Sequence, residues 1–257
     1  MLKKILAGAT ISIILAGSPA RADVRQYGED ENFLVYEITG IISKADVAAL
    51  ATLRKTAKNS SKGVMFHLNS DGGDVEAAIE LGRQLRTLQA FALTRNSGRC
   101  YSACVFVLAG AVYRVRSNSI GIHRPYSTNL TERTYKESQA EYERLAKLAK
   151  TFLLDVNVST SLYDAMIQVP PQKIRTLTLE EMDQFGLLET DPAKQDLDDN
   201  ASARYYGVSK IEYLRRKADL EVKCSNQLKR MTNGGNADIE PYLRCEESVM
   251  GKRRKIQ

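Results

Sequence analysis

The sequence alternates short apolar runs with segments whose apolar residues recur every three or four positions. The first kind predicts strands and the second predicts helices. Strands predicted at 33–38, 64–68 and 90–94 alternate with helices predicted at 44–57, 74–88 and 102–110, and short strands at 113–115 and 120–122 follow. Strands that alternate with helices are typical of βαβ units, so we predict an α/β fold.

Composition agrees with a globular protein. Of 257 residues, 43% are hydrophobic and 26% are charged, which excludes collagen-like, low-complexity and fully disordered chains. A chain of this length can bury a core without metal ions or disulfides as its main support.

The first 22 residues have the pattern of a secretory signal peptide. Lys3 and Lys4 precede a short apolar stretch at 5–17, and Ala20-Arg-Ala22 is a small-x-small cleavage site. The apolar stretch is shorter than the about 20 residues that a membrane-spanning helix needs. We therefore expect cleavage after Ala22 and a periplasmic or secreted protein with no membrane span after cleavage.

The mature chain divides into a body, a linker and a C-terminal piece. We place the body at 23–190, including a long amphipathic helix at 131–154. Residues 191–208 are polar and are predicted to be a loop-like linker. Residues 209–257 are predicted to form a helical hairpin with a basic tail. The tail could contact anionic lipid or nucleic acid, but we interpret it as a solvated terminus and expect no nucleic-acid partner in an exported protein.

An even number of cysteines in an exported chain suggests two disulfides. Cys224 and Cys245 flank the turn predicted at Asn233-Gly-Gly235 and would join the two arms of the hairpin. Cys100 and Cys104 form either a second disulfide or a pair of buried thiols, and both interpretations stay open. The two histidines lie elsewhere and no CxxC is present, so we expect no metal site.

Three places could carry chemistry. Gly72-Gly73 lies between a strand and a helix, where backbone N–H groups bind anions, although a plain tight turn explains the glycines equally well. Ser102 lies at a strand–helix junction beside the N–H of Ala103, as a nucleophile or as an ordinary N-cap. His123 ends a predicted strand, as a general base or as a structural residue. We interpret the other histidine, His67, as structural.

Together, four motifs resemble the proteolytic subunit of Clp protease, within the Clp/crotonase superfamily. They occur in the family's order: Asn69-Ser-Asp-Gly-Gly, Gly98-Arg-Cys-Tyr-Ser102-Ala, Ile122-His-Arg-Pro and Leu177-Thr-Leu-Glu-Glu-Met-Asp-Gln-Phe-Gly-Leu. The family counterparts read Asn-Ser-Pro-Gly-Gly, Gly-x-Ala-Ala-Ser-Met, Ile-His-Gln-Pro and Leu-Ser-Ala-x-Glu-Ala-x-x-Tyr-Gly-Leu. The resemblance covers residues 33–189 and is strongest to exported, Clp-protease-like members.

This resemblance implies a Clp/crotonase-like ββα superhelix with a long protruding helix, followed here by the C-terminal helical hairpin. It implies that Ser102 is the nucleophile, that His123 is the general base, and that the N–H groups of Gly73 and Ala103 bind the oxyanion. No cofactor is expected.

The resemblance also implies partners. Peptides or unfolded proteins would be the substrates, and an exported chain would act on them without cytosolic ATP. We expect a homo-oligomer formed through the helix at 131–154, with contacts from Tyr142, Leu145 and Phe152.

Two departures from the family pattern leave the function open. The family's catalytic aspartate aligns at about Ile174, and Asp164 is the nearby substitute we consider. The interval from Ser102 to His123 is also shorter than in the family. The leading hypothesis is an exported serine hydrolase, a peptidase. The alternative is a noncatalytic exported binding protein that keeps the fold, and an acyl-thioester enzyme is disfavoured because coenzyme A is not expected outside the cytoplasm.

Overall fold

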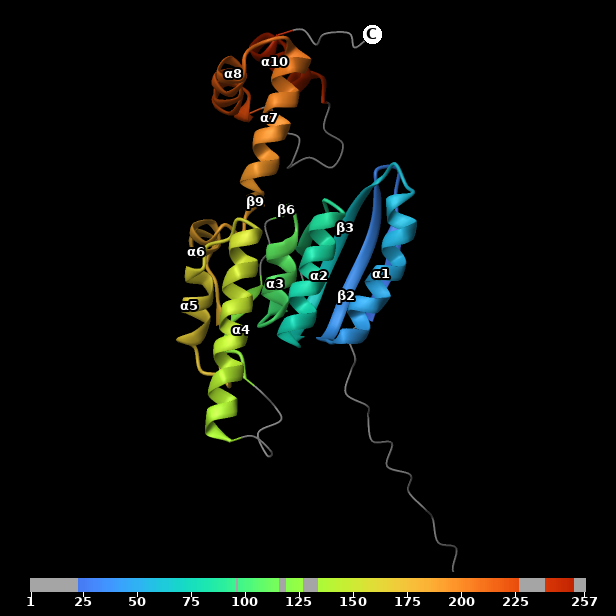
Figure 1. Cartoon of the computed structure of the whole chain (residues 1–257). Coiled ribbons are helices and arrows are strands. Elements are labelled where there is room, and N and C mark those ends of the chain that lie inside the picture. Colours follow the sequence, from blue (N-terminus) through green and yellow to red (C-terminus); the bar gives the residue numbers. More distant parts are fainter. Residues whose placement is uncertain (1–22, 96, 116–118, 127–133, 227–238, 252–257) are drawn as a thin grey trace, which may run out of the picture. The chain divides into compact units, whose positions relative to one another are not determined.

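The computed structural model describes residues 23–95, 97–115, 119–126, 134–226 and 239–251 (Figure 1). The chain forms two compact units that divide between Leu188 and Glu189. The predicted signal peptide, the turn at 233–235 and the basic tail lie outside the described residues. Within the described ranges, no helix is long and apolar enough to cross a membrane.

The first unit is a mixed α/β structure built on one long central strand. Its strands are β1 (Asp23–Glu29), β2 (Phe33–Ile42), β3 (Gly63–Gly73), β4 (Phe91–Thr94), β5 (Cys100–Tyr101), β6 (Tyr113–Arg114), β7 (Ile120–Ile122) and β8 (Arg175–Thr176). Along its length β3 pairs in parallel with β2, β4 and β5, and β5 pairs in parallel with β7. The outer strands β1 and β8 are antiparallel to their neighbours β2 and β7. The predicted α/β class is confirmed.

The first unit has six described helices, α1 (Lys44–Lys58), α2 (Val75–Thr87), α3 (Cys104–Gly110), α4 (Tyr135–Asp155), α5 (Ser161–Ile167) and α6 (Leu179–Phe185). Of these, α1, α2 and α3 lie side by side against this sheet, whereas α4 packs on α2 and α3, and α5 packs on α4 (Figure 1). Several of these helices have an N-cap side chain. The N-cap of α2 is Asp74, which accepts a hydrogen bond from the N–H of Ala77. The helix α6 begins after Thr178 and ends at Gly186, which is left-handed with φ of 77°.

The α2–α3 contact is the tightest of these helix packings. A Cβ on Gly110 would lie 2.2 Å from the carbonyl oxygen of Gly82, and a Cβ on Gly82 would lie 2.7 Å from that of Phe106. The two helices therefore touch through their backbones. This contact holds α3, whose residues are all buried, close to the sheet.

A buried arginine joins the ends of three helices. Arg114 is 2% exposed, and its guanidinium donates hydrogen bonds to the carbonyl oxygens of Ala109, Val156 and Gly186. These carbonyls lie at the carboxyl ends of α3, α4 and α6, where helix dipoles place partial negative charge. Carbonyl groups left unpaired by the helices thus help to solvate the buried cation.

The second unit contains the helices α7 (Pro192–Tyr206), α8 (Lys210–Lys223) and α10 (Glu240–Met250), after the short strand β9 (Glu189–Thr190). A disulfide joins Cys224, at the end of α8, to Cys245 in α10, which is the predicted pairing. Within this unit the Tyr206 hydroxyl donates a hydrogen bond to Glu246, and Arg216 donates one to the Met250 carbonyl.

Residues 191–208 were predicted to be a loop-like linker, and this prediction is wrong, because most of them form α7. Its polar sequence hides the helix: Asp191 caps the first turn, Pro192 occupies a first-turn position, and Gly207 ends the helix in the left-handed conformation. The helix has hydrogen-bonded polar side chains four residues apart, such as Gln195 and Asp199, and lacks the apolar stripe by which a helix is usually predicted.

Two further differences concern the sheet and α4. Residues 23–29 form β1, a largely polar edge strand with one buried side chain, Val24, so apolar alternation could not reveal it.

Phe152 was predicted as an oligomer contact, but it is fully buried against Phe106 and cannot contact another molecule. Tyr142 is 38% exposed and remains available on α4.

The α2–α3 contact gives a direct test of the fold. We expect Gly110→Ala to lower the free energy of unfolding by about 3 kcal/mol, because the added methyl group collides with backbone atoms that cannot move aside. Denaturant unfolding followed by circular dichroism measures the change. Gly28→Ala is the control, since nothing lies within 4 Å of its Cβ position. Equal stability of the two variants would contradict the packing described.

Candidate active site

Ser102 lies on the sharp turn between β5 and α3. Its φ is 54°, a left-handed conformation that is uncommon for residues other than glycine. Its backbone N–H donates a hydrogen bond to the Gly121 carbonyl oxygen at 2.9 Å, and Ala103 is the N-cap of α3. Ser102 is therefore not an ordinary N-cap. The strained strand–turn–helix geometry is that of a nucleophile elbow.

Gly72 packs directly against this turn. A Cβ on Gly72 would lie 2.7 Å from the Cβ of Ser102 and 2.9 Å from the backbone nitrogen of Ala103. The φ of Gly72 is 101°, so both its conformation and its surroundings require glycine. Gly73, the predicted oxyanion donor, follows at the end of β3, just before Asp74 and the amino end of α2.

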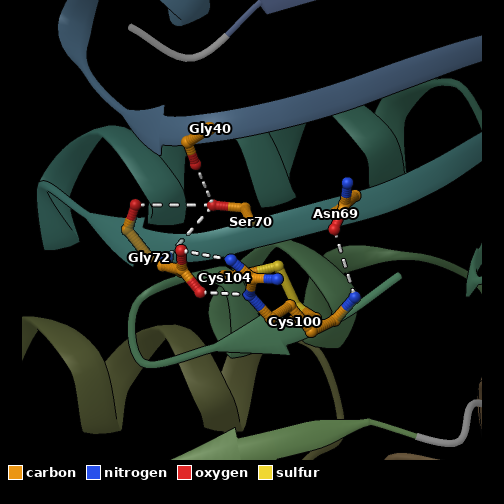
Figure 2. The surroundings of a disulfide bond; sticks show 8 residues. Gly40, Asn69, Ser70, Gly72, Cys100 and Cys104 are labelled. Atoms are coloured by element: carbon orange, nitrogen blue, oxygen red, sulfur yellow. Dashed lines mark hydrogen bonds and ion pairs between the residues drawn. A yellow bond between two sulfur atoms is a disulfide. The ribbon is translucent and has the colours of Figure 1, made fainter. Parts of the chain in front are cut away.

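A buried serine that sequence reasoning missed holds this glycine in place. The Ser70 hydroxyl donates a hydrogen bond to the Gly40 carbonyl at 2.6 Å and accepts one from the Gly72 N–H at 3.1 Å (Figure 2). Ser70 also pairs with Cys100 across the β3–β5 ladder. The strand β3 thus includes Gly72-Gly73, where a plain tight turn was one interpretation, and Ser70 fixes the path of the strand toward Ser102.

An ion pair on the surface ties the same two segments together. The Arg99 guanidinium binds both carboxylate oxygens of Asp71, with 2.8 Å between Arg99 Nη2 and Asp71 Oδ2. This hydrogen bonding holds the pKa of Asp71 below its ordinary value. The family motif has proline at the position of Asp71, so this pair is a feature of the present chain.

A disulfide brackets the candidate nucleophile. Cys100 and Cys104 are joined, both are fully buried, and Ser102 lies midway between them in the sequence (Figure 2). Of the two interpretations left open by the sequence, the structure has the disulfide rather than two free thiols. The bond links Cys100 of β5 to Cys104, the first residue of α3.

His123 directly follows β7, the strand that pairs with β5, and β5 ends just before Ser102. Tyr101 of β5 pairs with Gly121 of β7, and because these strands are parallel, the residues that follow them lie at the same edge. His123 is 6% exposed, and its Nδ1 lies 2.9 Å from the Arg124 carbonyl oxygen. The strand register thus brings the predicted nucleophile and the predicted base to the same end of neighbouring strands.

The predicted third member does not pair with His123. Asp164 Oδ1 lies 2.7 Å from Lys150 Nζ, and the Asp164 side chain is 52% exposed. Ile174, aligned with the family's aspartate, places a methyl group 2.5 Å from the Cβ position of Gly121. In the part of the chain that the structure describes, no carboxylate is hydrogen-bonded to His123.

The second histidine has a different setting. His67 lies in β3, its ring packs edge-on against Tyr27, and its Nδ1 is buried without a hydrogen-bond partner. Burial and the nearby charge of Arg95 lower its pKa, so it stays uncharged near neutral pH. These surroundings agree with a structural role.

Known proteins resemble part of this chain. A model of the Clp protease family matches residues 24–190. Among solved structures, a mutant of the 1510-N membrane-bound stomatin-specific protease is 14% identical, covering 63% of this chain and 79% of that one, with a TM-score of 0.45. Another mutant of that protease, bound to a substrate peptide, is 13% identical, with coverages of 61% and 73% and a TM-score of 0.48. A ClpP1 mutant from Listeria monocytogenes is 16% identical, with coverages of 60% and 88% and a TM-score of 0.47.

The Cys100–Cys104 disulfide should act on Ser102 locally. Because it closes a very short loop, we expect the Cys100→Ala/Cys104→Ala variant to lose little thermal stability. Displacement of Ser102 and the Ala103 N–H should nevertheless slow reaction with a fluorophosphonate, a reagent for activated serines, by about 10- to 100-fold.

The second disulfide supplies the control for this measurement. The Cys224→Ala/Cys245→Ala variant also loses two cysteines, but from the second unit, and should react at the rate of the unmodified protein. An unchanged rate in the Cys100→Ala/Cys104→Ala variant, or two free thiols at these positions in a peptide map of non-reduced protein, would contradict the local role.

Proposed function

Because the chain belongs to the Clp protease family, we propose that it is a serine peptidase in which Ser102 is the nucleophile and His123 the general base. The observation that carries the proposal is the left-handed Ser102 on the turn between β5 and α3, against which Gly72 packs. Such a turn places a serine at the carboxyl edge of a sheet, beside the first N–H groups of the next helix, and Ser102 is 9% exposed there.

The proposed reaction is acyl transfer through a covalent intermediate. The Ser102 hydroxyl attacks the carbonyl carbon of a peptide bond while the His123 imidazole takes its proton. The negative oxygen of the tetrahedral intermediate accepts hydrogen bonds from the N–H groups of Gly73 and Ala103. Its collapse releases the amine, which takes the proton from His123, and water then hydrolyses the acyl-enzyme by the same route.

We further propose that the protein works outside the cytoplasm after residues 1–22 are removed. Two disulfides support this, because such bonds persist in oxidising compartments and are rare in the cytosol. Without cytosolic ATP to drive unfolding, short peptides and already unfolded proteins are the proposed substrates.

Labelling by a fluorophosphonate tests the assignment. The purified mature protein should be labelled at one serine, and Ser102→Ala should abolish the labelling. His123→Gln should slow it by about 10²- to 10⁴-fold, the usual contribution of a general base. Ser159→Ala is the control, because Ser159 is an exposed serine hydrogen-bonded to Ser161. It should leave the rate of labelling unchanged. A folded protein that takes no label at any pH would instead be the noncatalytic binding protein.

Self-association through α4 is the second proposal under this heading. Tyr135 is 86% exposed and Leu154 is 65% exposed, and both lie on this helix together with the partly exposed Tyr142. Sedimentation should give a mass well above the 28.6 kDa of the chain at tens of micromolar. Tyr142→Lys should lower that mass, whereas Lys136→Ala on the same helix should not. A monomer under these conditions would contradict the proposal.

A further inference from the structure

His123 has a hydrogen-bond partner that fixes which of its nitrogens carries a proton. Nδ1 lies 2.9 Å from the backbone carbonyl oxygen of Arg124. A carbonyl oxygen can only accept, so this hydrogen bond requires a proton on Nδ1. A neutral imidazole carries one ring proton, which leaves the lone pair on Nε2. A general base that accepts a serine proton needs this tautomer.

The Arg124 carbonyl is held in place by the segment that ends α5. The Arg124 backbone N–H donates a hydrogen bond to the Val169 carbonyl oxygen at 2.8 Å. Its side-chain Nε donates another to the Ile167 carbonyl oxygen, also at 2.8 Å. Both acceptors lie at the carboxyl end of a helix, where a cation is favoured by the helix dipole.

The next residue restricts the same carbonyl from the other side. Pro125 has no N–H and a fixed φ, and a residue that precedes proline is confined to extended conformations. The Arg124 carbonyl therefore has little freedom to turn away from the imidazole. Ile174 fills the aligned position of the family's aspartate, and Asp164 is paired with Lys150.

We propose that the Arg124 carbonyl oxygen orients His123 in place of a carboxylate, so that the site works as a serine–histidine pair aligned by backbone. Arg124 is then a positioning residue: its side chain anchors its own carbonyl to the end of α5. This inference rests on the proposed function, because it assigns the orientation of the base in that reaction. It predicts that the site needs no acidic third member.

The tautomer of His123 gives a test that does not depend on activity. In protein with ¹⁵N-labelled histidine, a spectrum correlating ring nitrogens with ring protons distinguishes Nδ1–H from Nε2–H. The chain has two histidines, so His123→Gln identifies the signals of His67 by difference. We expect the neutral His123 ring to be the Nδ1–H tautomer. The Nε2–H tautomer would overturn the proposal.

Variants of Arg124 test the anchoring. Arg124→Ala should slow fluorophosphonate labelling about 10-fold and mix the two tautomers of His123, because the carbonyl loses one of its two anchors. Arg124→Lys keeps a cationic donor that can reach the Ile167 carbonyl and should restore part of the rate. Arg144→Ala is the control, since Arg144 is paired with Glu76 and Glu141 on the surface.

The outcomes separate this inference from the proposed function. If labelling persists in Ser102→Ala, the proposed function fails whatever the tautomer of His123. If labelling needs Ser102 and His123 but Arg124→Ala keeps the original rate and tautomer, the anchoring role fails alone. A slowed Arg124→Ala with an unchanged tautomer would show a merely structural role and would also overturn it.

Discussion

The backbone of Gly72 lies so close to Ser102 and Ala103 that no side chain fits between them, and the arrangement of the site depends on this contact. It brings the end of β3 against the turn that begins α3. Ser70 holds Gly72 from one side, and the Gly121 carbonyl holds the Ser102 N–H from the other. The strained conformation of Ser102 persists because these surrounding groups leave it no alternative.

Local signals in the sequence predicted much of the first unit. Asp74, Thr178 and Gly186 mark helix ends through hydrogen bonds that need only a few neighbouring residues, so these ends were predictable. The edge strand β1 and the polar helix α7 were missed for the opposite reason. The strand β1 depends on backbone pairing and the helix α7 on pairs of polar side chains. Neither has an apolar stripe, so the spacing of apolar residues could not predict them.

The candidate site shows the same division. Ser102, Gly72-Gly73 and His123 could be picked out because each lies in a motif next to a predicted strand end. The partners that place them could not: the Ser70 hydroxyl reaches Gly40, thirty residues away, and the Arg124 carbonyl is a backbone group with no sequence signature. Asp164 was considered because a carboxylate was expected, whereas its actual partner, Lys150, lies on a neighbouring helix.

Arg114 has a consequence for how the first unit responds to acid. The three helix ends that it joins are held by a guanidinium, which keeps its proton at every pH a protein meets, and by carbonyls, which do not titrate. This interior junction is therefore indifferent to acidity. Protonation of Glu181, whose pKa is lowered by the Thr178 N–H and by Arg175, would instead loosen α6 at its amino end while its carboxyl end stays tied.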